Sequence, residues 1–340
     1  MNILLTSVGR RSYLVEYFKT ALHGEGDVYV SNSTNITPAF LYADHSVVTP
    51  LIYSAEYIPF LLNYCKKNCI TAIISLLDID LPVLAAHREE FESIGTILVV
   101  SDLEVTKICN DKWATYRFLR RNGFRVPNTW LDLEMLEKSY NVDQIPFPLI
   151  IKPRWGMGSI GIYEAENRQE LEIFFHKVKR AALRSPMLKD ESNQDRERCV
   201  IIQEKIDGQE YGLDVINDLR KKYQTTIVKR KLAMRAGETD SAQVVDMPEI
   251  EAIGEQLANR LGHIANLDVD VFLKNGVPYV LEMNARFGGG YPFSHLAGVD
   301  LPRAIIGWLK GELPQEGFLE AKTGILGHKD LVIKKLTIKK

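Results

Sequence analysis

The sequence of 340 residues lacks the features that would place it at once in several broad classes of protein. It has no uncharged apolar run near the ~20 residues that a membrane-spanning helix needs. Its 42 Lys and Arg residues nearly balance 44 Asp and Glu residues, which leaves a formal charge of −2. Such a chain has no global attraction to nucleic acid or to an anionic membrane. Any polyanion that it binds must therefore be held by a local site.

Cysteine is scarce as well, with only four residues in the chain. Cys65 and Cys69 form a C-x3-C pair without a nearby downstream His or Cys, which is a poor zinc signature. Helical spacing on one face explains the pair more simply. We expect Cys65, Cys69, Cys109 and Cys199 to be reduced thiols of a cytosolic protein.

The beginning of the sequence shows no secretion signal. Residues 1–5 are a short apolar segment, and Arg10 and Arg11 follow without a small-residue cleavage motif. We therefore expect a cytoplasmic protein.

What the sequence does contain is an average globular composition, 46% apolar and 25% charged, in a length that predicts about two domains. The first 105 residues or so alternate between strand and helix patterns. We expect strands over 2–6, 27–31, 72–76 and 96–100, and helices over 13–22, 58–67 and 82–94. This alternation predicts βαβ units, a parallel sheet and an α/β domain.

A helix over 111–122 follows and is expected to end at Gly123. From Pro146 onward the spacing is typical of hairpins and an antiparallel sheet, so an α+β region is expected. Its strands are expected over 149–152, 161–165, 200–204, 211–217, 225–231, 269–274 and 278–283, with a helix over 169–183. Residues 184–198 are polar and predict a mobile surface loop. Residues 331–340 predict either an edge strand or a frayed basic tail.

Gly156, Gly158 and Gly161 spell G-x-G-x-x-G, which suggests a dinucleotide site. That motif must open a helix, whereas residues 162–165 read as another strand. No Gly-Lys-Ser/Thr follows, so a Walker loop is excluded too. We interpret the loop as a flexible flap beside Lys152, whose ammonium and backbone N–H donors suit phosphate oxygens. The alternative is an ordinary hairpin loop with a solvated lysine.

The most informative segment is a predicted hairpin of residues 269–273 and 277–284, joined by a Lys-Asn-Gly turn. Strand residues two apart face the same side, so Glu282, Asn284 and Arg286 project together if the strand geometry persists. Asp270 on the partner strand can face the same side, with Asp268 next to it. Carboxylates and a carboxamide are the oxygen ligands that Mg²⁺ prefers beside nucleotide phosphates. The alternative is a polar, solvated sheet face.

Five motifs together resemble the ATP-grasp superfamily, specifically its carbamoyl phosphate synthetase large-subunit-like carboxylate–amine ligases. They are Asp111-Lys112, Ile151-Lys152-Pro153 with its glycine flap, residues 203–210 (QEKIDGQE), residues 231–239 (KLAMRAGET) and Glu282-Met283-Asn284-Ala285-Arg286. The resemblance covers nearly the whole chain. It implies a Rossmann-like α/β domain with a parallel sheet (1–105) and then an α+β ATP-grasp module with antiparallel sheets. The module would comprise a small lid subdomain with the flap (106–200) and a large subdomain with the metal site (201–325), before a tail or edge strand (326–340).

The resemblance also implies roles for individual residues. Lys112 and Lys152 would contact the ATP phosphates, Glu204 to Ile206 the adenine, and Glu210 the ribose. Residues implied to bind ATP are Lys112, Lys152, Gly156, Gly158, Ser159, Gly161, Glu204, Lys205, Ile206, Glu210 and Lys231. Residues implied to act in catalysis are Arg286, Lys152 and Arg235. Residues implied to bind metal are Asp270, Glu282 and Asn284, although the family often has Glu or Gln at the first position. Lys229, Lys231 and Arg235 lie where the family places basic residues, and which of them faces the site stays open.

Substrate residues are less well defined by the sequence. Arg10 and Arg11 lie at the carboxyl end of a parallel strand, where α/β sheets bind ligands, but they equally suit an exposed helix start. Asp78 and Asp80 suit either an amine or a helix cap. Gly289 and Gly290, just past Arg286, suit either the wall of an acceptor pocket or a backbone turn.

The implied reaction is ATP-dependent: a small carboxylate becomes an acyl phosphate, and an amine then displaces phosphate. ATP and Mg²⁺, with Mn²⁺ as an alternative ion, are the implied cofactors, and no nucleic acid or membrane partner is expected. A homodimer is left open. Carbamoyl phosphate synthesis itself is not expected, because the chain has one set of motifs and no repeat. Two alternatives remain: a non-catalytic ATP-binding regulatory protein on the same scaffold, and a dehydrogenase suggested by the glycine loop.

Overall fold

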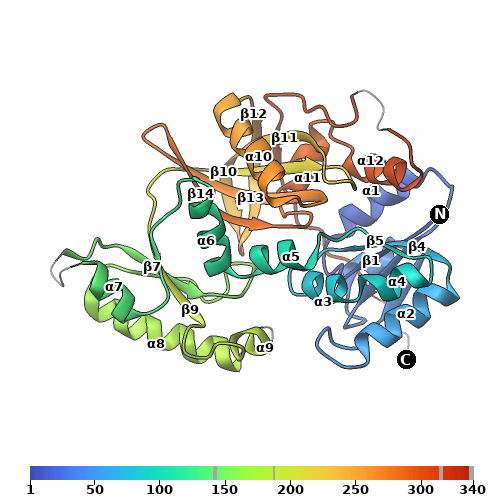
Figure 1. Ribbon diagram of the computed structural model, residues 1–340. Helices are drawn as coiled ribbons and strands as arrows, with labels where there is room; N and C mark the ends of the chain where they lie inside the picture. The colour runs from blue at the N-terminus through green and yellow to red at the C-terminus, as the bar shows by residue number, and fades with distance from the viewer. Residues whose placement is uncertain (141–143, 187, 314–316, 337–340) are drawn as a thin grey trace.

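The computed structural model describes residues 1–140, 144–186, 188–313 and 317–336. It contains three sheets (Figure 1). The first is parallel, in the order β3-β2-β1-β4-β5. Its strands are β1 (Asn2–Thr6), β2 (Val28–Asn32), β3 (His45–Val48), β4 (Ile70–Ser75) and β5 (Ile97–Leu98). Ile3, Leu4 and Leu5 in the central strand are all fully buried, as expected for a parallel sheet covered on both faces.

The helical elements of this first part are α1 (Ser12–Leu22), η1 (Pro38–Leu41), α2 (Tyr57–Lys67), α3 (Asp80–Ala86) and α4 (Arg88–Ser93). The parallel α/β prediction is confirmed. The prediction of a single helix over 82–94 is wrong in detail, because the helix is interrupted at His87, which ends α3 and precedes α4. The short elements η1 and β3 were not predicted.

Two helices, α5 (Leu103–Asn110) and α6 (Lys112–Arg121), lead to an antiparallel sheet in the order β6-β9-β7-β8. Its strands are β6 (Thr129–Trp130), β7 (Leu149–Pro153), β8 (Tyr163–Ala165) and β9 (Val200–Glu204). Helices α7 (Leu133–Ser139) and α8 (Arg168–Arg184) belong to this part, which we call the lid and which projects from the rest of the molecule in Figure 1. The apolar stripe of α8 packs against β7, because Leu171, Phe175 and Val178 recur at helical spacing.

The prediction of a mobile loop over 184–198 is wrong for the described residues of that segment. It contains the short helix α9 (Lys189–Ser192), and Leu188, Glu191 and Ser192 are buried. Arg154 also ties the segment down through Asp195 at 3.1 Å. Polar composition predicted exposure, but these side chains are buried against the rest of the protein.

The third sheet is antiparallel, in the order β14-β13-β10-β11-β12-β15. Its strands are β10 (Gln209–Asn217), β11 (Tyr223–Arg235), β12 (Glu238–Val245), β13 (Ala265–Lys274), β14 (Val277–Asn284) and β15 (Leu326–His328). Helix α10 (Pro248–Leu261) packs on β10 and β11, and α11 (Tyr291–Leu296) and α12 (Leu301–Leu309) follow β14. Strand β12 and these three helices were not predicted.

At the carboxyl end, the edge strand is β15, which pairs with β12. Residues 331–336, part of the predicted edge strand or tail, have no regular secondary structure. Residues 337–340 lie outside the described part. None of the described helices is both long enough and apolar enough to cross a membrane.

Candidate active site

The centre of the candidate site is the β13–β14 hairpin, whose register pairs Asp270 with Glu282 and Asp268 with Asn284. The turn was predicted from its sequence, and Asn275 and Gly276 both have positive φ, 52° and 75°, as a two-residue hairpin turn requires. The ladder shifts between Asp270 and Val271. Because Asp270 lies before this irregularity, it stays directly opposite Glu282.

Two lysines from outside this sheet contribute positive charge to the same site. Lys152 lies on β7 of the lid and Lys112 begins α6. The Lys112 Nζ donates to the Gly156 carbonyl at 2.6 Å, which links that lysine to the flap. The pKa of Lys152 is lowered to about 8, chiefly by burial and also by Lys112, while Glu282 and Asp270 oppose the shift. The geometry therefore brings both predicted phosphate lysines near the carboxylates of the hairpin.

Glu282 lies where the charges of the site converge. Burial raises its pKa, but Lys112, Lys152, Lys231 and Arg286 outweigh burial and hold that pKa below its ordinary range. These four cations come from α6, the lid, β11 and the segment after β14. Glu282 is therefore ionised and surrounded by positive charge.

Asp270 has a different environment, since it is paired directly with Lys231. The Lys231 Nζ lies 2.6 Å from Asp270 and 2.7 Å from Glu210. Burial and three neighbouring carboxylates raise the pKa of Asp270 to about 7, although Lys231 lowers it. Lys231 thus faces the site, whereas Lys229 is fully buried against Asp214 and Ser294.

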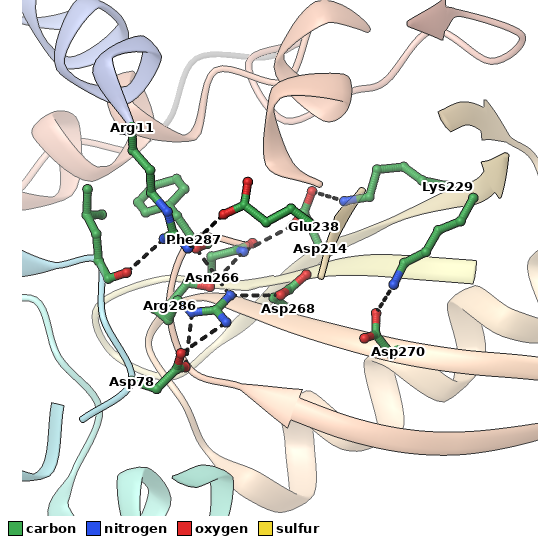
Figure 2. A network of polar contacts seen from close by, with 12 residues as sticks. Arg11, Asp78, Asp214, Lys229, Glu238, Asn266, Asp268, Asp270, Arg286 and Phe287 are labelled. Atoms are coloured by element: carbon green, nitrogen blue, oxygen red, sulfur yellow. Dashed lines mark hydrogen bonds and ion pairs between the residues drawn. The ribbon is translucent and has the colours of Figure 1, made fainter. Parts of the chain in front are cut away.

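Arg286 is oriented by two carboxylates (Figure 2). Its Nη1 donates to Asp268 at 2.8 Å, and its Nη2 donates to Asp78 at 3.2 Å. Strand β14 ends at Asn284, and the Arg286 amide donates back to the Asn284 carbonyl at 2.8 Å. The expected strand alternation therefore stops before Arg286, which reaches the site from a turn.

The donor set of the hairpin fits a divalent cation. Asp270 and Glu282 are carboxylates on paired positions, and Asn284 adds a carboxamide two residues along the same strand. The described residues contain no group of three or more His, Cys, Asp or Glu arranged around one metal position. The protein thus supplies two carboxylates and one amide, a set suited to a Mg²⁺ ion that takes its remaining ligands from phosphates and water.

The predicted adenine hinge follows β9. Glu204 ends that strand, and its Oε2 accepts hydrogen bonds from the Asn128 amide and side chain at 3.2 and 3.1 Å. Lys205 pairs with Glu164 at 2.6 Å, and Ile206 is buried. The Glu204 amide also donates to the Asn128 carbonyl at 2.8 Å. The side chains of Glu204 and Lys205 are thus held by neighbouring residues, and Ile206 is packed inside.

The flap adopts a backbone that only glycine tolerates easily. Gly156, Gly158 and Gly161 have φ values of 141°, 61° and 74°, and exposed Ser159 has 57°. A Cβ added at Gly237 of the β11–β12 turn would lie 2.4 Å from the Gly158 carbonyl carbon. The flap and this turn therefore touch.

Two predicted site residues, Arg235 and Arg10, do not join the charged residues around the β13–β14 hairpin. Arg235 is exposed and donates to Asp240 at 2.8 Å on its own hairpin. Its separation from Lys231 follows from register shifts on either side of Ala233, which break the strand alternation that would put both side chains on one face. Arg10 is exposed.

The remaining substrate candidates behave differently from one another. Arg11 is fixed by the Leu76 and Phe287 carbonyls at 2.8 and 2.9 Å. Asp80 is fully buried, so it does not meet a ligand. Its carboxylate accepts hydrogen bonds from Thr6, Ser75 and Tyr57 at 2.6 to 2.8 Å.

Three consecutive glycines follow Arg286, and each packs against one charged side chain. A Cβ at Gly288 would lie 2.2 Å from the Asp268 carboxylate, one at Gly289 3.2 Å from Glu238, and one at Gly290 3.5 Å from Lys229. Gly289 and Gly290 therefore border charged groups, and their place in the wall of an acceptor pocket stays a prediction.

Sequence reasoning gave Glu238 no role and missed the pairing of Lys229 with Asp214. Glu238 lies 4.0 Å from Arg11 and 3.4 Å from Lys329. It lies in the motif of residues 231–239, but it begins a strand that was not predicted, so its contact with Arg11 was not foreseen. Asp214 had a signal that went unused, since an aspartate inside an apolar strand pattern demands a buried partner.

Comparisons with known proteins agree with this architecture. Residues 3–99 match a PylC-like N-terminal domain, and residues 109–290 match an ATP-grasp domain. D-alanine–D-alanine ligase A of Bacillus cereus is 26% identical over 257 residues, covering 68% of this chain and 77% of the relative. A carbamoyl phosphate synthase large chain of a Mycobacterium species is 24% identical over 246 residues, but this match covers only 21% of that relative and 68% of this chain.

Solved structures show the same fold. Biotin carboxylase of Campylobacter jejuni aligns with a TM-score of 0.74 at 17% identity, covering 94% of this chain and 73% of the other. An L-amino acid ligase of Bacillus licheniformis aligns with a TM-score of 0.69 at 18% identity, covering 91% and 75%. The predicted superfamily and fold class are confirmed, and because the ATP-grasp domain model matches more than half of the sequence, this chain belongs to the ATP-grasp family.

Proposed function

We propose that this chain is an ATP-dependent ligase that joins a small carboxylate to an amine and uses Mg²⁺ as its divalent ion. The observation that carries the proposal is the convergence of Lys112, Lys152, Lys231 and Arg286 on Glu282. This arrangement suits a triphosphate with its metal ion. The cations can neutralise the negative phosphate oxygens, and the carboxylate can neutralise the positive metal. Membership of the ATP-grasp family and the ligases among the relatives support it.

In this proposal ATP lies between the lid and the large sheet. Lys112 and Lys152 bind phosphate oxygens, and the flap from Gly156 to Gly161 covers them. The backbone of the hinge at Glu204 to Ile206 contacts the adenine. Glu210 binds the ribose and is oriented for this by Lys231.

Asp270, Glu282 and Asn284 would hold the metal. When bound, Mg²⁺ would neutralise charge on the phosphate oxygens, and Mn²⁺ has the same ligand preference. The protein's own contribution is to keep two carboxylates and one amide together on paired strands.

The reaction has two balanced steps. A carboxylate oxygen of the acid attacks the γ-phosphorus and breaks its bond to the β–γ bridging oxygen, giving an acyl phosphate and ADP. The amine nitrogen then attacks the acyl carbon, the bond from that carbon to the phosphate oxygen breaks, and the proton lost by the nitrogen ends on the phosphate that leaves. Arg286 and Lys152 stabilise the transferring phosphoryl group, because their guanidinium and ammonium need no reorganisation when charge develops. Arg235 has no part in this scheme, since it is held on Asp240.

The test is a coupled assay of ADP and phosphate release with a panel of small acids and amines, in the presence and absence of Mg²⁺. We expect release only when a suitable acid, an amine and the metal are all present, with mass spectrometry identifying the amide. Tight ATP binding without ADP release across the panel would favour a non-catalytic regulatory protein. Binding of NADH in preference to ATP would overturn the ligase proposal.

The assembly is a separate part of the proposal. We expect a soluble enzyme that acts on small molecules, with a homodimer as the alternative to a monomer. Size-exclusion chromatography with light scattering distinguishes the two.

A further inference from the structure

The contact between the N-terminal α/β part and Arg286 suggests a role for Asp78 that the proposed function leaves unassigned. Asp78 lies in the turn between β4 and α3, 208 positions before Arg286 in the sequence. Its Oδ1 lies 3.0 Å from the Arg286 Nε, and its Oδ2 accepts from the Nη2 at 3.2 Å. Only the Nη2 contact is a hydrogen bond, because the Nε makes none with the described residues. One carboxylate thus lies close to two nitrogens of the guanidinium, and this charge pairing restricts how its plane can turn.

A second carboxylate, that of Asp268, contacts the guanidinium of Arg286 through a different nitrogen. Asp268 on β13 accepts from Nη1 at 2.8 Å. The side chains of Arg286 and Asp78 are each 10% exposed and that of Asp268 is 16% exposed. In such a low-dielectric setting charge pairs are only weakly screened, so the two carboxylates together determine where the guanidinium points.

A third contact fixes the distance between the two parts of the chain. The Arg11 Nη1 donates to the Leu76 carbonyl at 2.8 Å and to the Phe287 carbonyl at 2.9 Å. Leu76 is two residues from Asp78, and Phe287 is adjacent to Arg286. Arg11 therefore ties the turn that carries Asp78 to the segment that carries Arg286, as Figure 2 shows.

We propose that Asp78 is a positioning residue of the ligase reaction, by which the N-terminal α/β part orients Arg286 toward the γ-phosphate of ATP. The inference rests on the proposed function, because it takes Arg286 to contact that phosphate. Asp78 itself touches neither ATP nor the acid in this scheme. The large subdomain alone fixes only one side of the guanidinium, so the arginine needs the α/β part to be held in its working orientation.

Asp80 provides a matched control, since it lies two residues further along the same turn and helix start. It is fully buried, but its partners are hydroxyl groups and not Arg286. Burial raises its pKa, although those hydroxyls oppose the shift. A neutral asparagine at position 80 should therefore be accommodated and leave Arg286 undisturbed.

The experiment is calorimetric titration of the full-length protein with two nucleotides, each with Mg²⁺: the non-hydrolysable ATP analogue AMP-PNP and ADP. We expect Asp78→Asn to weaken AMP-PNP binding about tenfold, since misplacement of a charged group by ~1 Å costs of this order or more. ADP affinity should stay within about twofold, because ADP lacks the γ-phosphate. Asp80→Asn should change neither affinity.

A double-mutant cycle separates positioning from a direct role. Lysine has no planar guanidinium for Asp78 to orient. In an Arg286→Lys background, adding Asp78→Asn should therefore have no further effect on AMP-PNP affinity. An equal loss in both backgrounds, or no loss in Asp78→Asn alone, would overturn the inference while leaving the ligase proposal standing. Failure of the wild-type protein to bind either nucleotide would overturn the proposed function itself.

If Asp78→Asn does not fold, as judged by circular dichroism, Arg11→Met replaces it. That variant leaves both carboxylates in place but removes the tie to Leu76 and Phe287. The same selective loss of AMP-PNP affinity, smaller in size, is expected, and equal losses for AMP-PNP and ADP would contradict the inference.

Discussion

Gly237 lies directly against the backbone of Gly158, so that the turn between β11 and β12 meets the flap over the site. Both residues have positive φ, 77° and 61°. The contact involves backbone atoms on both sides and leaves no room for a side chain. An acyl phosphate hydrolyses in water, so a flap that closes against this turn would protect the intermediate.

We predict that Gly237→Ala lowers the yield of amide per ATP consumed, because its Cβ would lie 2.4 Å from the Gly158 carbonyl carbon and prevent closure. The expected loss is of order tenfold, measured as the ratio of amide formed to ADP released. Gly276→Ala is the control for backbone strain, since Gly276 has nearly the same φ, 75°, and open space around it. Equal ratios in the two variants would show that closure does not depend on this contact.

Glu282→Ala should abolish turnover and leave the fold intact. Four cations lower the pKa of this side chain, so its loss removes the negative charge that balances them and, in the proposed function, one ligand of the metal. We expect AMP-PNP binding to lose its dependence on Mg²⁺, measured by titration with and without EDTA. Glu164→Ala, which removes an ion pair with Lys205 in the lid, serves as control and should retain the Mg²⁺ dependence. Full activity of Glu282→Ala would remove the basis for the metal site.

The hairpin at the centre of the site could be predicted because its signals are local. A Lys-Asn-Gly turn between two apolar strands specifies the pairing, and the pairing places Asp270 opposite Glu282. The parallel sheet was predictable for the same reason, since each buried strand is a short apolar run. Lys152 was predicted from the glycine flap beside it and Lys112 from the family motifs. The structure brings both close to Glu282 of the hairpin.

The parts of the site and of the fold that the sequence did not predict depend on interactions between distant segments. Nothing near Asp78 indicates that it meets Arg286, because their contact spans 208 positions and forms only when two sheets pack together. Arg235 was assigned to the site from its position in a motif, yet register shifts around Ala233 turn it toward Asp240. Glu191 lies in a polar segment, but it is buried against Asn110. Composition and periodicity carry no information on such long-range partners.

We predict that only one of the four thiols reacts rapidly with a reagent such as DTNB. Cys69 is exposed, whereas the other three are buried. Burial raises the pKa of Cys65 and that of Cys109 to about 12, which leaves a thiolate fraction of about 10⁻⁴ at pH 8. Native protein should show one fast thiol and denatured protein four, and Cys69→Ser should remove the fast one. Any fast thiol in native Cys69→Ser would contradict the burial of the other three cysteines.

His263 should make the protein less stable in mild acid. It is fully buried before β13, its Nε2 contacts the Val215 carbonyl at 3.0 Å, and its Nδ1 has no hydrogen-bond partner within the described part of the chain. Burial lowers its pKa from 6.5 to about 4, although the backbone contact opposes the shift. The unfolded chain therefore takes up a proton at a higher pH than the folded chain does. The contribution of this neutral histidine is fully present above pH 6.5 and is lost as the pH falls toward 4.

The size of this effect follows from linkage, since a shift of about 2.5 pKa units corresponds to about 3 kcal/mol. We expect the free energy of unfolding, measured by urea titration, to fall more steeply between pH 6.5 and 4 in the wild type than in His263→Gln. The difference between the two proteins at pH 8 gives the packing cost of the substitution alone, because the histidine is neutral in both states there. A difference that is independent of pH would show that His263 gains a proton in the folded protein as readily as in the unfolded chain.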